Sequence, residues 1–279
     1  MMIMDKKTIV VVGAGQGLGN HVAKQFGKEG FRVILMARNE QALKGYEQEF
    51  AAEGIEVYTH TVDAASPETL TEALHWVKST FGTPEVLVYN VGITTPDEPG
   101  KIDCEELMRR YQVDVASAYH CISQVVDEEF GQKKGTILVT GGGLALYPSV
   151  AYLPLSLDKA ALRAMVYALH EALKLRNIFV GTVTVCGAIG GDGFFAPSRI
   201  AESYWKMYNE RGACEIVYTE TNIKEDCNEN KTIKKPGSVS HRYGLHGIQY
   251  GLRQNSRRKR VNPSDAGSTR QGVQFLRHG

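Results

Sequence analysis

The sequence of 279 residues lacks several features that mark whole classes of protein. It contains no run of about 18 apolar residues, the length that a membrane-spanning helix needs. Its five cysteines include no Cys-x-x-Cys pair, which argues against a disulfide framework and a structural zinc site. The histidines show no metal-ligand spacing. We therefore expect a reduced, cytoplasmic protein that binds no metal and has no membrane partner.

The net charge of +1 hides an uneven distribution. Residues 1–218 carry 20 Lys and Arg against 26 Asp and Glu, whereas residues 219–279 carry 12 against 5. Only 14 of these last 61 residues are apolar, too few for a core of their own. The sequence thus predicts an acidic globular domain over 1–218 and a basic tail, disordered or foreign to the domain, over 219–279. The tail lacks interleaved aromatics, so we predict no nucleic-acid partner.

Strand-like and helix-like segments alternate along the first 218 residues. Short apolar or alternating runs predict strands at Thr8–Val12, Arg32–Met36, Glu56–Thr61, Val86–Tyr89, Gly135–Thr140, Phe179–Val185 and Glu215–Tyr218. Apolar positions at helical spacing predict helices at Leu18–Gly27, Gln41–Ala52, 66–81, Asp103–Phe130, Asp158–Arg176 and Pro197–Tyr208. Pro154 indicates that the fifth helix begins no earlier than about Leu155. This alternation predicts an α/β fold with one doubly wound parallel sheet of about seven strands in the order 3-2-1-4-5-6-7, with helices on both faces.

A glycine-rich turn follows the first predicted strand and opens the first predicted helix. Its members are Gly13, Gly15, Gln16, Gly17, Leu18 and Gly19. Glycine permits positive φ and lets the backbone approach a pyrophosphate closely, and a helix N-terminus offers free N–H groups. The position between a strand and a helix favours a dinucleotide-binding turn over an ordinary loop.

The end of the second predicted strand indicates which dinucleotide is bound. An acidic residue usually stands there and binds the ribose hydroxyls of NAD. Here the chain has Ala37, Arg38 and Asn39, with no carboxylate to repel a phosphate. The Arg38 guanidinium can bind a phosphate through two hydrogen bonds. The sequence favours NADP(H) over NAD(H), with a solvated Arg38 as the alternative.

These features resemble the short-chain dehydrogenase/reductase family over residues 8 to about 218. The motifs that carry the resemblance are the glycine turn, Tyr89-Asn90-Val91-Gly92, Lys159-Ala160-Ala161-Leu162 and Val185-Cys186-Gly187-Ala188-Ile189. The resemblance implies a Rossmann fold in which Asp63 meets the adenine. It also implies that Asn90 and Gly92 line the cofactor and that Gly187 and Ile189 meet the nicotinamide. A homo-oligomer is implied as well, for which we expect a homodimer, with a tetramer as the alternative.

The catalytic group of that family, which is Asn, Ser, Tyr and Lys, is only partly present. Lys159 matches the Lys, which in the family binds the nicotinamide ribose and lowers the pKa of the Tyr. The places of Tyr, Ser and Asn hold Leu155, Gly142 and Asp114. Leucine has no proton to donate and glycine has no hydroxyl. We therefore consider Tyr152 as a substitute acid and Asp114 as a base, against purely structural roles for both.

Two functions remain open at this point. The chain is either an NADP(H)-dependent oxidoreductase of a small carbonyl compound or alcohol, or a catalytically inactive NADP-binding protein that acts as a sensor or partner subunit. The candidate catalytic residues of the first are Lys159, Asp114 and Tyr152. The cofactor motifs support both functions, and the missing Tyr and Ser favour the second. The substrate is not specified, because the loop Gly190–Phe195 offers only glycines, one Asp and two Phe.

Overall fold

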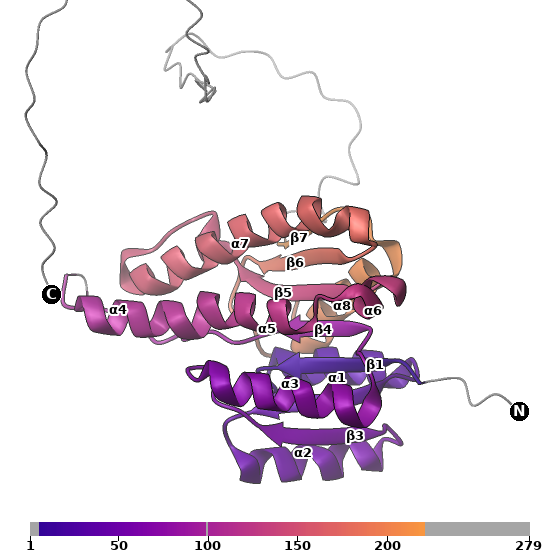
Figure 1. Ribbon diagram of the computed structural model, residues 1–279. Coiled ribbons are helices and arrows are strands. Elements are labelled where there is room, and N and C mark those ends of the chain that lie inside the picture. The colour runs from indigo at the N-terminus through magenta and orange to yellow at the C-terminus, as the bar shows by residue number, and fades with distance from the viewer. Residues whose placement is uncertain (1–5, 99, 221–279) are drawn as a thin grey trace, which may run out of the picture. The chain divides into compact units, whose positions relative to one another are not determined.

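The computed structural model describes residues 6–98 and 100–220. Within them, seven strands form one parallel sheet in the order β3-β2-β1-β4-β5-β6-β7 (Figure 1). The strands are β1 (Thr8–Val12), β2 (Arg32–Ala37), β3 (Val57–Thr61), β4 (Val86–Tyr89), β5 (Thr136–Gly142), β6 (Phe179–Val185) and β7 (Glu215–Tyr218). The predicted doubly wound Rossmann fold and its strand order are confirmed.

Strand β1 at the centre of the sheet shows why its strands are apolar throughout. Ile9 and Val11 point to one face and Val10 and Val12 to the other, and all four are fully buried. The first face is covered by α1 (Leu18–Lys28), α2 (Glu40–Ala52) and α8 (Pro197–Glu210). The second is covered by α3 (Pro67–Phe81), α5 (Ser117–Val125) and α7 (Leu153–Leu173). A sheet covered on both faces exposes neither set of alternating side chains to water.

The carboxyl ends of the strands share one edge of the sheet because all the strands are parallel. In Figure 1, β1 begins near the N-terminal label on the right and the strands run to the left. The loops that follow β1, β4, β5 and β6 therefore meet at the left-hand edge. This is the edge at which open α/β sheets bind their ligands.

The long helical stretch predicted over Asp103–Phe130 is confirmed from Cys104 to Val125 and wrong only after Val125. The structure has α4 (Cys104–Tyr111), a π-helical turn over Gln112–Ala116, then α5, and finally the separate α6 (Glu128–Gln132). Two carboxylates mark the irregular points of this stretch. Asp114, in the π-turn, accepts the N–H of Ile93 from the segment after β4, at 3.0 and 3.1 Å. Asp127 caps α6 by accepting the N–H of Phe130 at 2.8 Å.

The predicted start of the fifth helix is also wrong. Helix α7 begins at Leu153, two residues before Leu155, and Pro154 lies in its first turn. Proline is tolerated there because the first helical N–H groups have no partner within the helix. Tyr152 is the N-cap, with φ −137° and ψ 44°, so it lies just outside the helix.

Within residues 6–98 and 100–220, no helix is long and apolar enough to cross a membrane. The same residues contain no group of three or more His, Cys, Asp or Glu that could hold a metal ion. The predicted basic tail lies, from residue 221 onward, outside the described residues.

Candidate functional site

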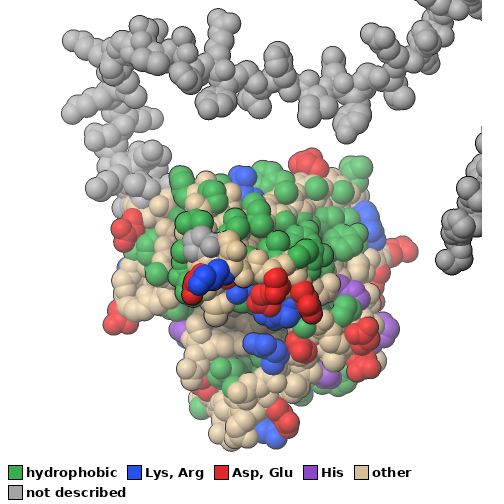
Figure 2. Space-filling view, turned by 90° about the vertical axis from the view of Figure 1, so that its left-hand side faces the viewer, with side chains coloured by type: hydrophobic (Ala, Val, Ile, Leu, Met, Phe, Trp, Pro, Cys, Tyr) green, Lys and Arg blue, Asp and Glu red, His purple; other side chains and the backbone are tan. Residues whose placement is uncertain are grey.

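Two adjoining cavities open at the carboxyl edge of the sheet. The larger has a volume of about 830 Å³ and the smaller about 200 Å³. Asn90, Val91 and Gly92, directly after β4, line both cavities and therefore join them. Figure 2 looks onto this side of the molecule and shows a hollow in the surface, with hydrophobic side chains gathered above it. We refer to the two adjoining cavities together as the trough.

The glycine turn between β1 and α1 lies against the joint of the two cavities. A Cβ on Gly13, which has φ +92°, would lie 2.6 Å from the carbonyl oxygen of Asn90. A Cβ on Gly19 would lie 2.5 Å from the carbonyl oxygen of Gly13. A Cβ on Gly15 or Gly17, in contrast, would meet no atom within 4 Å. The first two glycines are thus required by packing, whereas the other two leave open space for a ligand.

The N-terminus of α1 is available to an anion. Gly17 is its N-cap, and in the described part of the chain no side chain caps it. Asn20 accepts the N–H of Gly15 at 2.9 Å and so fixes the turn. Gly17 and Leu18 line the larger cavity, whereas Gln16 is exposed and lies outside both cavities. The free N–H groups and the positive end of the helix dipole suit a phosphate group.

The smaller cavity contains the residues that were predicted to select the cofactor. Ala37 and Arg38 at the end of β2 line it, and no carboxylate is among its described lining residues. Arg38 is exposed and forms no ion pair with another described residue. Asp63 is not in the lining, although Val62 and Ala64 on either side of it are. One oxygen of Asp63 accepts the N–H of Ala65 at 2.9 Å, which leaves the other open to the rim.

Lys159 lies at the floor of the larger cavity. Its Nζ donates a hydrogen bond to the carbonyl oxygen of Thr140 at the end of β5, at 2.8 Å. The Thr140 hydroxyl in turn donates to Asn90 at 2.8 Å and lies 2.8 Å from the Tyr204 hydroxyl. Burial lowers the pKa of the Lys159 ammonium, and the carboxylates of Asp114 and Asp158 oppose that shift. The Lys159 side chain is therefore held by β5, and Thr140 links it to Asn90 after β4.

Asp114 lies behind the cavity wall and does not line the cavity. It is fully buried, and a Cβ on Gly92 would stand between it and Lys159, 3.9 Å from its Oδ2 and 3.5 Å from Nζ. Burial raises the pKa of its carboxyl, against the hydrogen bond from Ile93 and the charge of Lys159. Its place on a π-helical turn agrees with the frequent occurrence of such turns at functional sites.

The remaining predicted residues surround the mouth of the larger cavity. Gly142, Tyr152, Leu155, Gly187 and Ile189 all line it together with Lys159. A Cβ on Gly142 would lie 3.4 to 3.7 Å from side-chain carbons of Lys159. Leu155 and Gly142 thus line the same cavity as Lys159, and neither side chain supplies a hydroxyl group.

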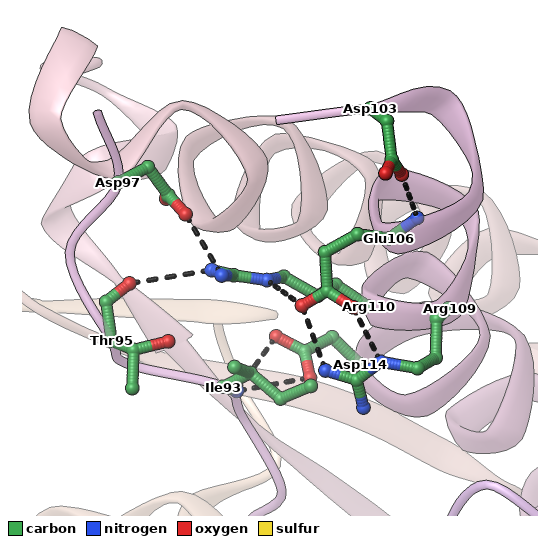
Figure 3. Close-up of polar contacts among 8 residues, drawn as sticks. All are labelled: Ile93, Thr95, Asp97, Asp103, Glu106, Arg109, Arg110 and Asp114. Atoms are coloured by element: carbon green, nitrogen blue, oxygen red, sulfur yellow. Dashed lines mark hydrogen bonds and ion pairs between the residues drawn. The ribbon is translucent and has the colours of Figure 1, made fainter. Parts of the chain in front are cut away.

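Sequence reasoning missed a buried charged cluster beneath this site (Figure 3). Arg110 pairs with Asp97 at 2.8 Å and with Glu106 at 2.8 Å, and Figure 3 shows its guanidinium between these two carboxylates. Asp158, which precedes Lys159 on α7, is 1% exposed, and neither of its oxygens has a hydrogen-bond partner among the described residues. Burial and the charge of Asp114 raise the pKa of Asp158 to about 7. The only signal for this cluster in the sequence was Asp158 beside Lys159 on a helix whose other buried residues are mostly apolar.

Comparison with known proteins identifies the family. Residues 7–192 match the family model for short chain dehydrogenases, so the chain belongs to that family. A diacetyl reductase of the (S)-acetoin-forming type from Staphylococcus epidermidis is 28% identical over 133 residues, 47% of this chain and 52% of that protein. An uncharacterized oxidoreductase of Thermotoga maritima is 24% identical over 209 residues, 75% of this chain and 77% of that protein. The match to the first relative thus spans about half of its length.

Solved structures agree with the fold. A metagenomic short-chain oxidoreductase in complex with NADP is 22% identical with a TM-score of 0.69, over 76% of this chain and 96% of that one. An alcohol dehydrogenase from the archaeon Thermococcus sibiricus, complexed with 5-hydroxy-NADP, is 20% identical with a TM-score of 0.68, over 77% and 98%. At this level of identity the likeness establishes the shared architecture.

Proposed function

We propose that the protein is an NADP(H)-dependent oxidoreductase that acts on a carbonyl compound or the corresponding alcohol. The observation that carries this proposal is the trough, which runs from Arg38 past the glycine turn and the α1 N-terminus to Lys159. The family to which the chain belongs supports it. A fluorescence titration with NADPH tests binding, and NADPH consumption over a panel of ketones and aldehydes tests turnover.

The residues of the trough fit such a cofactor along its length. Arg38 would hold the 2′-phosphate and the rim at Asp63 the adenine, both at the smaller cavity. The α1 N-terminus would hold the pyrophosphate, because Gly15 and Gly17 leave the space open. In the larger cavity, Lys159 would bind the nicotinamide ribose, with Gly187 and Ile189 against the ring, as the family resemblance implies.

Tyr152 is the proton donor that we propose for the reaction. When bound, NADPH supplies a hydride to the carbonyl carbon of the substrate. The carbonyl oxygen then needs a proton, which Leu155 and Gly142 cannot give. Tyr152 lines the same cavity as Lys159, and its phenol has no hydrogen-bond partner among the described residues. The phenol gives its proton to the oxygen, and solvent restores that proton through the open mouth of the cavity.

Two glycine replacements in the turn should have different effects, one on stability and the other on NADPH binding. Gly19→Ala should lower the free energy of unfolding by about 2 kcal/mol, because its Cβ would overlap the backbone at Gly13. Gly17→Ala should leave stability nearly unchanged but weaken NADPH binding about tenfold or more, because its Cβ would occupy ligand space. Urea denaturation and fluorescence titration measure the two effects. Equal NADPH affinity of Gly17→Ala and wild type would contradict the placement of the pyrophosphate.

Arg38 should decide the preference for the phosphorylated cofactor. We expect Arg38→Ala to weaken NADPH binding about tenfold or more and to leave NADH binding unchanged, because a charge-assisted contact contributes roughly 1.5–3 kcal/mol. Arg176→Ala removes an exposed arginine at the opposite edge of the sheet and serves as the matched control. An unchanged NADPH-to-NADH preference in Arg38→Ala would refute the assignment.

A catalytically inactive NADP-binding protein is the second candidate function. Leu155 and Gly142 beside Lys159 favour it, because the family's proton donor and hydroxyl have these places. The two candidates differ in one measurement. NADPH binding without consumption over the whole carbonyl panel would support the inactive protein, and substrate-dependent consumption would exclude it.

We propose that the chain forms a homodimer through α4 and α7, which pack against each other. Large apolar side chains are exposed on both helices: Met108 and Tyr111 on α4, and Leu153, Leu157 and Tyr167 on α7. A second copy would remove these side chains from water. Light scattering after gel filtration distinguishes the dimer from a monomer and from a tetramer.

A further inference from the structure

The larger cavity has few charged groups in its lining, and several of its polar groups are already paired. Asn90 is occupied by Thr140 and by the carbonyl oxygen of Gly13, and the Thr140 hydroxyl is occupied by Asn90 and Tyr204. Lys159 is bonded to the Thr140 carbonyl. Among the described lining residues there is no Asp, Glu, His or Arg. A carboxylate would thus find no Arg or His to pair with, and a polyhydroxylated substrate would find only the hydroxyls of Thr94, Tyr147 and Tyr152 without a partner among the described residues, so burying its other polar groups is costly.

The walls and the mouth of this cavity are apolar. Leu144, Leu155 and Ile189 line the cavity together with Lys159. Leu155 stands at the position of the family's catalytic Tyr, so this position carries an alkyl side chain and no hydroxyl. At the mouth, Tyr147 is 74% exposed and Ile189 is 42% exposed, although both line the cavity. Large apolar side chains that border a cavity yet face water indicate a surface that a ligand covers.

The loop after β6 lines the cavity only with its first residues, 186–189. Only 11 residues, 186–196, separate β6 from α8. They fold back on themselves, since the N–H of Gly190 donates to the carbonyl oxygen of Phe195 at 3.0 Å. The ring of Phe194 stacks on Tyr218, with centroids 4.6 Å apart. Residues 190–195 are therefore packed toward β7 and lie outside the cavity lining, so they take up none of the cavity's volume of about 830 Å³.

From these observations we infer that the substrate is a bulky apolar carbonyl compound, such as a fused-ring ketone. It is neither a polyhydroxylated ketone nor a keto acid. This inference rests on the proposed function, because it places the substrate over a cofactor bound in the same trough. The carbonyl lies toward Lys159 and Tyr152, and the hydrocarbon part lies against Leu155, Leu144 and the exposed face of Tyr147.

The test compares two ketones on the NADPH-bound protein. 1-Decalone carries a fused hydrocarbon ring system, and dihydroxyacetone carries two hydroxyls. We expect 1-decalone to bind at least tenfold more tightly, measured by the change in NADPH fluorescence. We also expect Tyr147→Ser to weaken 1-decalone binding about tenfold with unchanged NADPH affinity, because it removes the apolar surface at the mouth. Tyr119→Ser, an exposed tyrosine on α5 outside the cavity lining, is the matched control and should change neither.

The outcomes separate this inference from the proposed function. Failure of the wild type to bind NADPH would overturn both. Normal NADPH binding with equal or tighter binding of dihydroxyacetone would overturn the substrate class alone. The same holds if Tyr147→Ser binds 1-decalone as tightly as Tyr119→Ser does.

Discussion

The double variant Gly142→Ser, Leu155→Tyr should reduce generic ketones up to about 100-fold faster than the wild type, because a positioned general acid contributes at least that factor. Leu155 lies one helical turn before Lys159 and lines the larger cavity, so a tyrosine there places a phenol beside the ammonium group. A Cβ on Gly142 would lie 3.4 to 3.7 Å from carbons of Lys159, which is ordinary contact, so a serine fits without displacing the lysine.

The matched control for this gain is Gly142→Ser, Leu155→Phe, which has the same ring without the hydroxyl. Initial rates of NADPH consumption at saturating ketone should rise in the tyrosine variant and not in the phenylalanine variant. If the rate rises equally in both variants, the shape of the cavity and not the lack of a proton donor limits the rate of the wild type. Tyr152→Phe in the wild-type background completes the comparison. If it leaves a measurable turnover unchanged, Tyr152 is not the donor.

Asp158→Asn should stabilise the protein at pH 8 by about 1–4 kcal/mol, an unusual sign for a change in the core. The Asp158 carboxyl is 1% exposed and has no hydrogen-bond partner among the described residues. Asp114 repels its negative charge, while Lys159 and Arg110 only partly offset that repulsion. Burial raises the pKa of Asp158 to about 7 in the folded state, against about 3.9 in the unfolded chain.

The sign of the pH dependence follows from these two pKa values. Below about pH 4 the carboxyl is protonated in both states and contributes no difference. Between about pH 4 and 7 the unfolded chain loses the proton and the folded protein keeps it, so stability falls as pH rises. Above about pH 7 the full cost of ionising a buried carboxyl is present. The neutral side-chain amide of the Asp158→Asn variant never bears that cost.

Urea denaturation at pH 5 and at pH 8 measures this effect. The stability difference between Asp158→Asn and wild type should be larger at pH 8 than at pH 5. Asp192→Asn, an exposed position in the loop after β6, should show no such difference. A variant less stable than wild type at pH 8 would mean that the Asp158 carboxylate is stabilised by a group other than those named above.

The sequence by itself determined the sheet and the position of the glycine turn and Arg38 along it. Each strand is a contiguous apolar or β-branched run, and every connection contains at least one helix, so a parallel sheet with right-handed crossovers follows from local pattern. The glycine turn is equally local, because strand, turn and helix are consecutive in Thr8–Lys28. Arg38 follows β2 directly, so it lies at the carboxyl edge of the sheet, as the glycine turn does.

Only the tertiary structure decided the chemistry around Lys159. Asp114 lies on a π-turn and accepts the N–H of Ile93, which is 21 residues away in the sequence. Whether Asp158 is solvated or buried depends on α4 and the π-turn that pack against α7. The hydrogen bond from Lys159 to Thr140 joins residues on two different elements. Such contacts depend on which distant segments meet, and no periodicity along the chain records that.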